Sequence, residues 1–249
     1  SSAASDVYKR QLWKSEPWEE FDYDAFNSQR FTEAIIERER VSDICRVLYP
    51  NDTTYEGKKL RVRQQYFFTS ASLQAMVRTH LAQHGSLKNF AEFHSVQLND
   101  THPVLAIPEL MRLLLDEHGM GWEEAWEIVS NTFAYTNHTV LTEALEQWDQ
   151  QIFQQLFWRV WEIIAEIDRR FRIERSAEGI DGVTIQRMAP IQHGVVHMAW
   201  IACYAAYSIN GVAALHTEII KRETLGDWYA LWPEKFNNKT NGVTPVSYT

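Results

Sequence analysis

The sequence contains little cysteine and no excess of basic residues. Its 249 residues include two cysteines, Cys45 and Cys203, which are too few for a disulfide framework and too far apart for a CxxC metal pair. Lys and Arg number 24 against 33 Asp and Glu, which gives a formal charge of −9. Binding to nucleic acid or to an anionic membrane needs clustered cations, so the composition argues against both partners. The scarcity of cysteine fits a reducing, cytoplasmic setting.

Several signatures of function are missing as well. The chain has no GxSxG, no GxxxxGK[ST] and no GxGxxG, so nucleophile-elbow hydrolases, P-loop proteins and dinucleotide-binding proteins lack support. Residues 1–11 lack the apolar stretch that a signal peptide needs. Their composition also differs from the aromatic, acidic chain that follows. We interpret residues 1–11 as a non-native leader and residues 246–249 as a non-native tail, on either side of a genuine segment, 12–245.

The chain has one long run without charged residues, Met188–Thr217. Its length would permit a membrane span. Histidine, serine, asparagine and glycine interrupt the run, and the flanking sequence is polar and amphipathic. We therefore expect a buried helix of a soluble domain, which extends to Ile220, and no membrane segment.

The spacing of apolar residues predicts mostly helix, with two short strands. Helices are expected over residues 24–40, 60–83, 108–118, 122–131 and 150–173. Strands are expected at Phe93–Leu98 and Phe133–Thr136, and a loop at Tyr49–Gly57. Strands that alternate with helices indicate a helix-rich α/β fold. Polar corners follow both strands, at residues 99–102 and 137–139, where ligands bind in open α/β sheets.

Four residues in polar corners are candidates for ligand binding. Asp100 and His102 could face one cleft for hydroxyl recognition or acid/base work, although the spacing alone favours an Asx-turn with an incidental histidine. His138 could bind a sugar hydroxyl or be a satisfied core histidine. Asn241, before Gly242, could bind a polyol through its amide, or it could simply form a turn.

Two histidine pairs raise the question of a metal. His80 and His84, like His193 and His197, are spaced i, i+4, which places two imidazoles on one face of a helix. No HExxH motif accompanies either pair, and no carboxylate is evidently placed as a third ligand. We therefore expect no metal site, and a metal-dependent hydrolase that uses His193 and His197 remains a minor alternative.

Five longer segments, in this order and at these separations, resemble the α-1,4-glucan phosphorylases, the family of glycogen, starch and maltodextrin phosphorylases. The likeness is greatest to the bacterial type and covers nearly all of residues 12–245. The segments are RVLYPND at 46–52, QLNDTHP at 97–103, AYTNHT at 134–139, NGVAALH at 210–216 and NKTNG at 238–242.

This resemblance implies a partial glycosyltransferase-B fold. The chain would form the later part of the first Rossmann-like domain and the approach to the second, so it would be an internal fragment that lacks the C-terminal domain. Members of the family are cytoplasmic enzymes of glycogen catabolism. They transfer a terminal α-1,4-linked glucosyl unit of a glucan to phosphate, giving glucose 1-phosphate with retention. They use pyridoxal phosphate and are usually homodimers. The lysine that carries this cofactor in the family is absent from the chain, so the isolated segment is expected to be inactive.

The resemblance also assigns roles to individual residues. His138 and Asn241 would bind the glucosyl unit, while Asp100 and His102 would shape the cleft. The loop with Asn51, Asp52 and Thr53 would gate access to it. Thr53 and Thr54 depart from the Asn and Phe of the animal enzymes, which removes a loop contact to glucose and an aromatic stacking site. A non-catalytic glucan-binding or scaffold protein without the cofactor domain is the alternative function.

Overall fold

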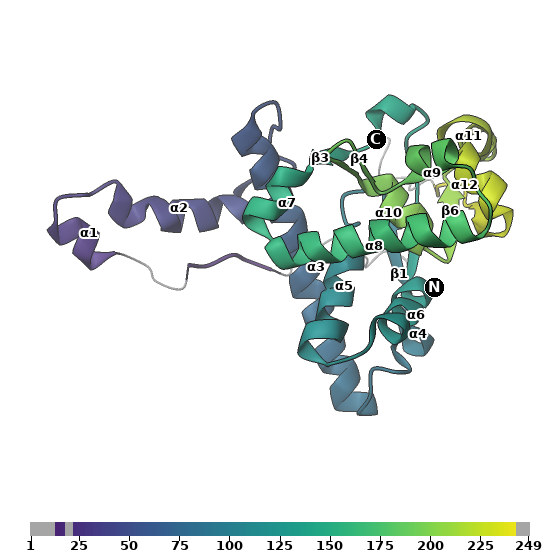
Figure 1. The fold of residues 1–249 in the computed structure, drawn as a ribbon. Helices are drawn as coiled ribbons and strands as arrows, with labels where there is room; N and C mark the ends of the chain where they lie inside the picture. Colours follow the sequence, from purple (N-terminus) through teal and green to yellow (C-terminus); the bar gives the residue numbers. More distant parts are fainter. Residues whose placement is uncertain (1–12, 18–21, 243–249) are drawn as a thin grey trace. The chain divides into compact units, whose positions relative to one another are not determined.

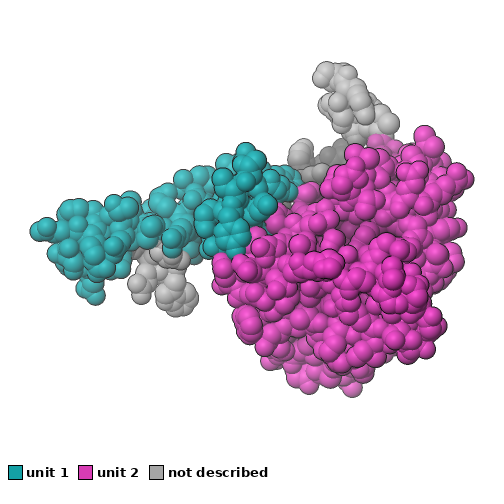
Figure 2. All heavy atoms as spheres, turned by 45° about the horizontal axis from the view of Figure 1, so that its top comes forward, with its two compact units in different colours: residues 1–71 teal, residues 72–249 magenta. Residues whose placement is uncertain are grey.

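A computed structural model describes residues 13–17 and 22–242 of the chain (Figure 1). The expected leader and tail both lie outside these residues. The chain divides into two compact units, residues 1–71 and residues 72–249, which Figure 2 colours separately. Each unit is described by itself below.

The first unit contains two helices where one was expected. Helix α1 spans Tyr23–Asn27 and helix α2 spans Glu33–Arg46. The backbone of Gln29 has a positive φ of 63°, which ends α1 and separates the two helices. The expected end of the helix at residue 40 is wrong, because α2 continues to Arg46. Arg46 forms exposed ion pairs with Glu39 and Asp43 along this part of the helix.

Helix α3 spans Tyr55–His84 and begins in the first unit. It confirms the helix expected over residues 60–83 and begins five residues earlier. The Oγ1 of Thr54 accepts a hydrogen bond from the Gly57 N–H at 3.1 Å, which satisfies one free donor of the first turn. The predicted loop before α3 is therefore shorter than expected.

A parallel sheet forms the centre of the second unit. Its strands are β1 (Val96–Asn99), β2 (Phe133–Thr136), β6 (Ser208–Gly211) and β7 (Phe236–Asn238), in the spatial order β1-β2-β6-β7. All three pairings are parallel. A smaller antiparallel sheet contains β3 (Gln147–Asp149), β5 (Val195–His197) and β4 (Ile191–Gln192). The helix-rich α/β class is therefore confirmed. Residues Phe90–Phe93 form the short helix α4, so β1 begins later than expected.

Helices surround the central sheet and supply most of the core. Trp228, Tyr135, Phe153 and Phe171 are among the largest fully buried side chains. Besides α4, the helical segments of the second unit are α5 (Ala106–Arg112), a π-helical turn (Leu113–Glu117), α6 (Trp122–Thr132), a 3-10 turn (Thr142–Ala144), α7 (Gln150–Leu156), α8 (Trp158–Ala177), α9 (Gly182–Met188), α10 (Met198–Ala205), α11 (Ala214–Ile219), a second π-helical turn (Ile220–Thr224), α12 (Gly226–Leu231) and a second 3-10 turn (Pro233–Lys235).

The expected single helix over residues 188–220 is wrong. The uncharged run contains a β-hairpin, helix α10, the central strand β6 and helix α11. His193 and Gly194 both have positive φ, of 49° and 80°, and make the hairpin turn between β4 and β5. Strand β6 lies between two parallel neighbours, and such strands are typically apolar because both faces are covered. No helix among the described residues is long and apolar enough to cross a membrane.

The long helix expected over residues 150–173 is divided into α7 and α8. Asp149 caps α7, since its Oδ1 accepts a hydrogen bond from the Gln151 N–H at 2.8 Å. Phe157 then adopts φ −144° and ψ 67°, which is incompatible with helix and separates α7 from α8. Phe153 and Phe171 are fully buried on either side of this break, so the apolar spacing continues although the helix does not.

Three histidines form a cluster at the C-terminal end of α3. His80 is fully buried, and its Nε2 lies 2.9 Å from the Ser86 carbonyl oxygen, which can only accept a hydrogen bond. The proton of His80 is therefore on Nε2, and Nδ1 accepts from Nε2 of His94 at 3.1 Å. Burial, and then the charges of His80 and His84, lower the pKa of His94. Burial therefore disfavours the charged form of His94.

We expect the second unit to lose stability as the pH falls. A lowered pKa in the folded state means that the unfolded chain binds protons first, so the contribution of His94 is complete above about pH 6.5 and is lost below it. His94→Gln retains an amide donor for His80 but does not titrate. Urea unfolding followed by circular dichroism at pH 7, 6 and 5 should show a flatter dependence on pH for His94→Gln than for the natural sequence.

His118→Gln is the matched control, because His118 is exposed on the π-helical turn after α5. It should retain the full dependence on pH. If His94→Gln and the natural sequence lost stability in parallel, the histidine cluster would not be responsible.

Candidate functional site

The polar segments that follow the four parallel strands meet at one edge of the central sheet. Because all four strands run in the same direction, their carboxyl ends lie together. Corners were expected after β1 and β2, with a turn at Asn241; the structure places that turn after β7 and adds a fourth corner, after β6. The four corners are residues 99–102, 137–139, 210–213 and 238–241. Figure 1 labels β1 and β6, two of the strands that carry them.

Backbone hydrogen bonds join these corners beyond the regular ladders. The Asn137 N–H donates to the Asn210 carbonyl at 3.0 Å, and the Asn241 N–H donates to the Val212 carbonyl at 3.0 Å. A buried side-chain bond lies just below, where Thr136 Oγ1 donates to Asn210 Oδ1 at 2.9 Å. Gln97 reaches the same Thr136 Oγ1 at 2.7 Å. The corners are therefore held at fixed positions, as hydroxyl recognition requires.

His138 lies exposed at the end of β2, and one of its nitrogens has a partner. Its Nε2 lies 2.5 Å from Oδ1 of Asn99, at the end of β1. An amide oxygen only accepts, so the neutral imidazole carries its proton on Nε2 and presents Nδ1 as an acceptor. Asn99 was not among the candidate residues. The sequence feature that could have identified Asn99 is its position directly before Asp100, in the same polar corner.

Asp100 and His102 lie in the corner after β1, with different partners. Asp100 has a φ of 65°, a conformation that Asp and Asn tolerate, and its Oδ1 accepts from the Thr101 N–H at 2.6 Å. Nδ1 of His102 lies 3.4 Å from Oε2 of Glu146. The Glu146 side chain is only 12% exposed, so it is largely shielded from solvent. No sequence pattern identified Glu146, since it approaches His102 only in the tertiary structure.

Asn241 lies exposed after β7, and only its backbone is fixed, by the bond to Val212. His138 and Asn241 thus follow β2 and β7, the two strands that pair with β6 on either side. The structure brings together His138 with Asn99 and His102 with Glu146.

His216 and Gly211 form a tight contact beside this edge. A Cβ added to Gly211 would lie 2.8 Å from Nδ1 of His216 and 2.4 Å from Oγ1 of Thr217. Nδ1 of His216 accepts a hydrogen bond from the Val212 N–H at 3.2 Å. Burial, and then the charge of His138, lower the pKa of His216, while a contact with the His138 backbone raises it. His216 is therefore a neighbour of His138 that sequence analysis did not select.

The loop predicted to gate the site belongs to the first unit and is ordered by its own bonds. Oδ1 of Asn51 accepts from the N–H and the hydroxyl of Thr53, at 2.8 and 2.7 Å. Asp52 pairs with Arg61 at 2.9 Å. A Cβ on Gly57 would lie 2.2 Å from the Asn51 carbonyl oxygen, so only glycine fits there. Its role as a gate remains a prediction.

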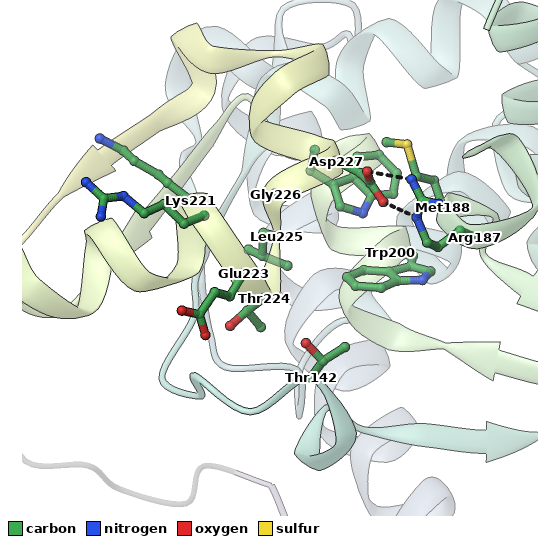
Figure 3. Close-up of a pocket in the computed structure, with 12 residues that line it drawn as sticks. Thr142, Arg187, Met188, Trp200, Lys221, Glu223, Thr224, Leu225, Gly226 and Asp227 are labelled. Carbon is green, nitrogen blue, oxygen red and sulfur yellow. Dashed lines mark hydrogen bonds and ion pairs between the residues drawn. The ribbon is translucent and has the colours of Figure 1, made fainter. Parts of the chain in front are cut away.

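A cavity of about 380 Å³, lined by both polar and apolar side chains, lies in the second unit, outside the strand-end corners (Figure 3). Arg187 and Asp227 form a two-pronged ion pair at its wall, at 2.5 and 2.8 Å. Trp200, Thr142 and Glu223 also line it. None of His138, Asn241, Asp100 and His102 is among the lining residues, so this cavity is not the predicted sugar site.

The structure places the two histidine pairs differently. His193 and His197 lie on the hairpin of β4 and β5, so the expectation of a shared helical face is wrong for them. His80 and His84 do share a face of α3, with ring centroids 4.5 Å apart. Both nitrogens of His80 are already bonded within the protein. The described residues contain no group of three or more His, Cys, Asp or Glu side chains that could hold a metal ion.

Comparison with known proteins decides the family. Residues 3–249 match the profile of the carbohydrate phosphorylases. The chain belongs to the carbohydrate phosphorylase family. It is 48% identical to the glycogen phosphorylase of Synechocystis sp. over 239 residues, 45% identical to the glycogen phosphorylase of Bacillus subtilis, and 46% identical to an alpha-glucan phosphorylase, H isozyme, of Vicia faba. Each alignment covers 94% of the chain.

The chain spans 28–29% of the length of these phosphorylase relatives. The resemblance found in the five sequence segments is therefore confirmed at the level of the family. The parallel sheet agrees with a partial glycosyltransferase-B-like fold. What the whole phosphorylase does is addressed below as a proposal.

We expect Gly211→Ala to destabilise this phosphorylase segment by about 1–3 kcal/mol, the usual effect of overpacking. The new Cβ would meet the backbone of Thr217 at 2.9 Å, and a backbone atom cannot rotate away as a side chain can. Gly182→Ala is the control, because that glycine begins α9 with no atom within 4 Å of an added Cβ. Alanine there should be neutral or stabilising. Equal thermal midpoints for Gly211→Ala and the natural sequence would contradict the close packing.

Proposed function

We propose that this chain supplies one half of the glucosyl-binding site of an α-glucan phosphorylase. The complete enzyme would transfer a terminal α-1,4-linked glucosyl unit to inorganic phosphate and release glucose 1-phosphate, as the names of its relatives suggest. His138 and Asn241 would bind the glucosyl unit, and Asp100 and His102 would shape the cleft. We further propose that the enzyme is a cytoplasmic homodimer and that the loop at residues 51–53 gates the site.

The observation that carries this proposal is the hydrogen bond between His138 and Asn99, which determines the tautomer of His138. Its Nε2 is engaged by Asn99, so its Nδ1 can accept a hydrogen bond from a sugar hydroxyl. The amide of Asn241 adds two donors and one acceptor from the other side of β6. A site that hydrogen-bonds each hydroxyl discriminates strongly against ligands that lack one. A glucosyl unit, rich in hydroxyls, fits these groups.

Neither Lys235 nor Lys239, the two lysines beside β7, fits a pyridoxal phosphate site. Lys235 lies at the start of β7, opposite the candidate edge, and donates to the carbonyls of Cys203 and Tyr204 at 3.2 and 3.0 Å. Burial lowers the pKa of Lys235 to about 8, yet its ammonium group caps the end of α10. Lys239 lies exposed after β7, with its backbone bonded to Gly211. We propose that cofactor and phosphate bind elsewhere in the complete enzyme, and we derive no step through the cofactor.

A glucan-binding or scaffold protein without catalysis is the second candidate. The corners after β1, β2 and β7 favour it as much as the enzyme, because they recognise hydroxyls without performing chemistry. A phosphorolysis assay separates the two. The chain should release no glucose 1-phosphate from maltoheptaose and phosphate, whereas the product of the complete source gene should. A complete gene product that binds maltoheptaose but never releases glucose 1-phosphate would favour the scaffold.

We expect the isolated chain to bind glucose and maltoheptaose weakly at the strand-end corners. Two-dimensional NMR should show shifts of the Asn99, His138 and Asn241 amides upon titration. His138→Ala and Asn241→Ala should each weaken binding about two- to tenfold, the range for loss of one hydrogen bond. His118→Ala, which removes an exposed histidine away from these corners, should bind normally. Shifts confined to other surfaces would contradict the proposed site.

A further inference from the structure

His216 is the one histidine beside the candidate edge whose function is not accounted for. It lies on α11, directly after β6, and its ring packs against the end of that strand because Gly211 has no side chain there. Its Nδ1 accepts the Val212 N–H at 3.2 Å. A neutral imidazole with Nδ1 as acceptor carries its proton on Nε2. The hydrogen-bonding direction of the ring is therefore determined.

The Nε2–H group of His216 is buried close to His138. Nε2 is shielded from solvent, and no described side chain or backbone group, the His138 backbone included, hydrogen-bonds it with good geometry. The backbone that the His216 ring does contact is that of His138, and the two imidazoles interact electrostatically. A buried donor without a partner is costly, so a neighbouring carbonyl oxygen is its natural acceptor.

We infer that His216 is a positioning residue for the glucosyl site. Its Nε2–H faces the His138 backbone and keeps the His138 ring at hydrogen-bond distance from Asn99. The chain of contacts runs from the Val212 N–H through His216 to His138 and on to Asn99, and so connects the ends of β6, β2 and β1. His216 does not itself touch the sugar. The part of this inference that concerns ligand affinity rests on the proposed function.

His216→Asn isolates the Nε2–H group. The Oδ1 atom of asparagine occupies nearly the position of histidine Nδ1, so the Val212 N–H keeps an acceptor, while nothing replaces Nε2–H. Thr217→Val is the matched control on the same helix. It removes the hydroxyl that donates to the Ala213 carbonyl and to Oδ1 of Asn238, at 2.8 and 3.0 Å, without altering His216. Both variants should lower the thermal midpoint.

Long-range ¹H–¹⁵N spectra of the histidine rings provide the deciding measurement. In the natural chain, His216 should be the Nε2–H tautomer, and the Nε2–H signal of His138 should be protected from exchange by Asn99. His216→Asn should abolish that protection and weaken glucose binding about two- to tenfold. Thr217→Val should leave both unchanged.

Two results would overturn the inference. One is a protected His138 signal in His216→Asn that equals that of the natural chain. The other is a natural chain in which the His216 proton lies on Nδ1, a result that needs no variant to fold. Absence of glucose binding in the natural chain would refute the proposed function instead, and the His138 spectra would still decide the role of His216.

Discussion

The direction of the four central strands is the constraint on which the candidate site depends. Parallel strands place all their carboxyl ends at one edge, where the backbone turns away and its polar groups lose their ladder partners. Here the backbone groups of the corners hydrogen-bond to one another, as the bonds from Asn137 to Asn210 and from Asn241 to Val212 show. The same bonds fix the corners in space. A rigid, polar edge results from satisfying the backbone and is then available for ligand recognition.

Close packing at the end of β6 adds a second constraint. Gly211 allows His216 and Thr217 to approach the strand more closely than any side chain at that position would permit. This close approach buries an imidazole next to His138, and the burial favours its neutral form. The segment that carries Gly211 and His216 was recognisable in the sequence as a family motif. In the structure, this motif forms the contact between helix α11 and the end of strand β6.

Sequence periodicity predicted the secondary structure correctly where a segment has the same environment along its whole length. Helix α3, helix α6 and strand β2 agree closely with expectation, because each has a regular spacing of apolar residues and a distinct end. It failed over residues 188–220, where helix α10 and strand β6 are both largely buried and no charged residue up to Thr217 marks where one element ends and the next begins. Periodicity cannot distinguish elements that are apolar on every side. The break at Phe157 was missed for a related reason, since the apolar spacing continues through it.

The sequence by itself determined the family, the α/β class and the polar corners that carry His138, Asn241, Asp100 and His102, because these depend on local composition and on motifs in order. The tertiary structure decided which residues meet. Asn99 reaches His138, Glu146 reaches His102, and His216 packs beside His138. These pairs are separated by 39, 44 and 78 positions in the chain, and only the order of strands in the sheet brings them together. Long-range pairing of this kind is set by how strands and helices pack, and that packing leaves no local pattern in the sequence.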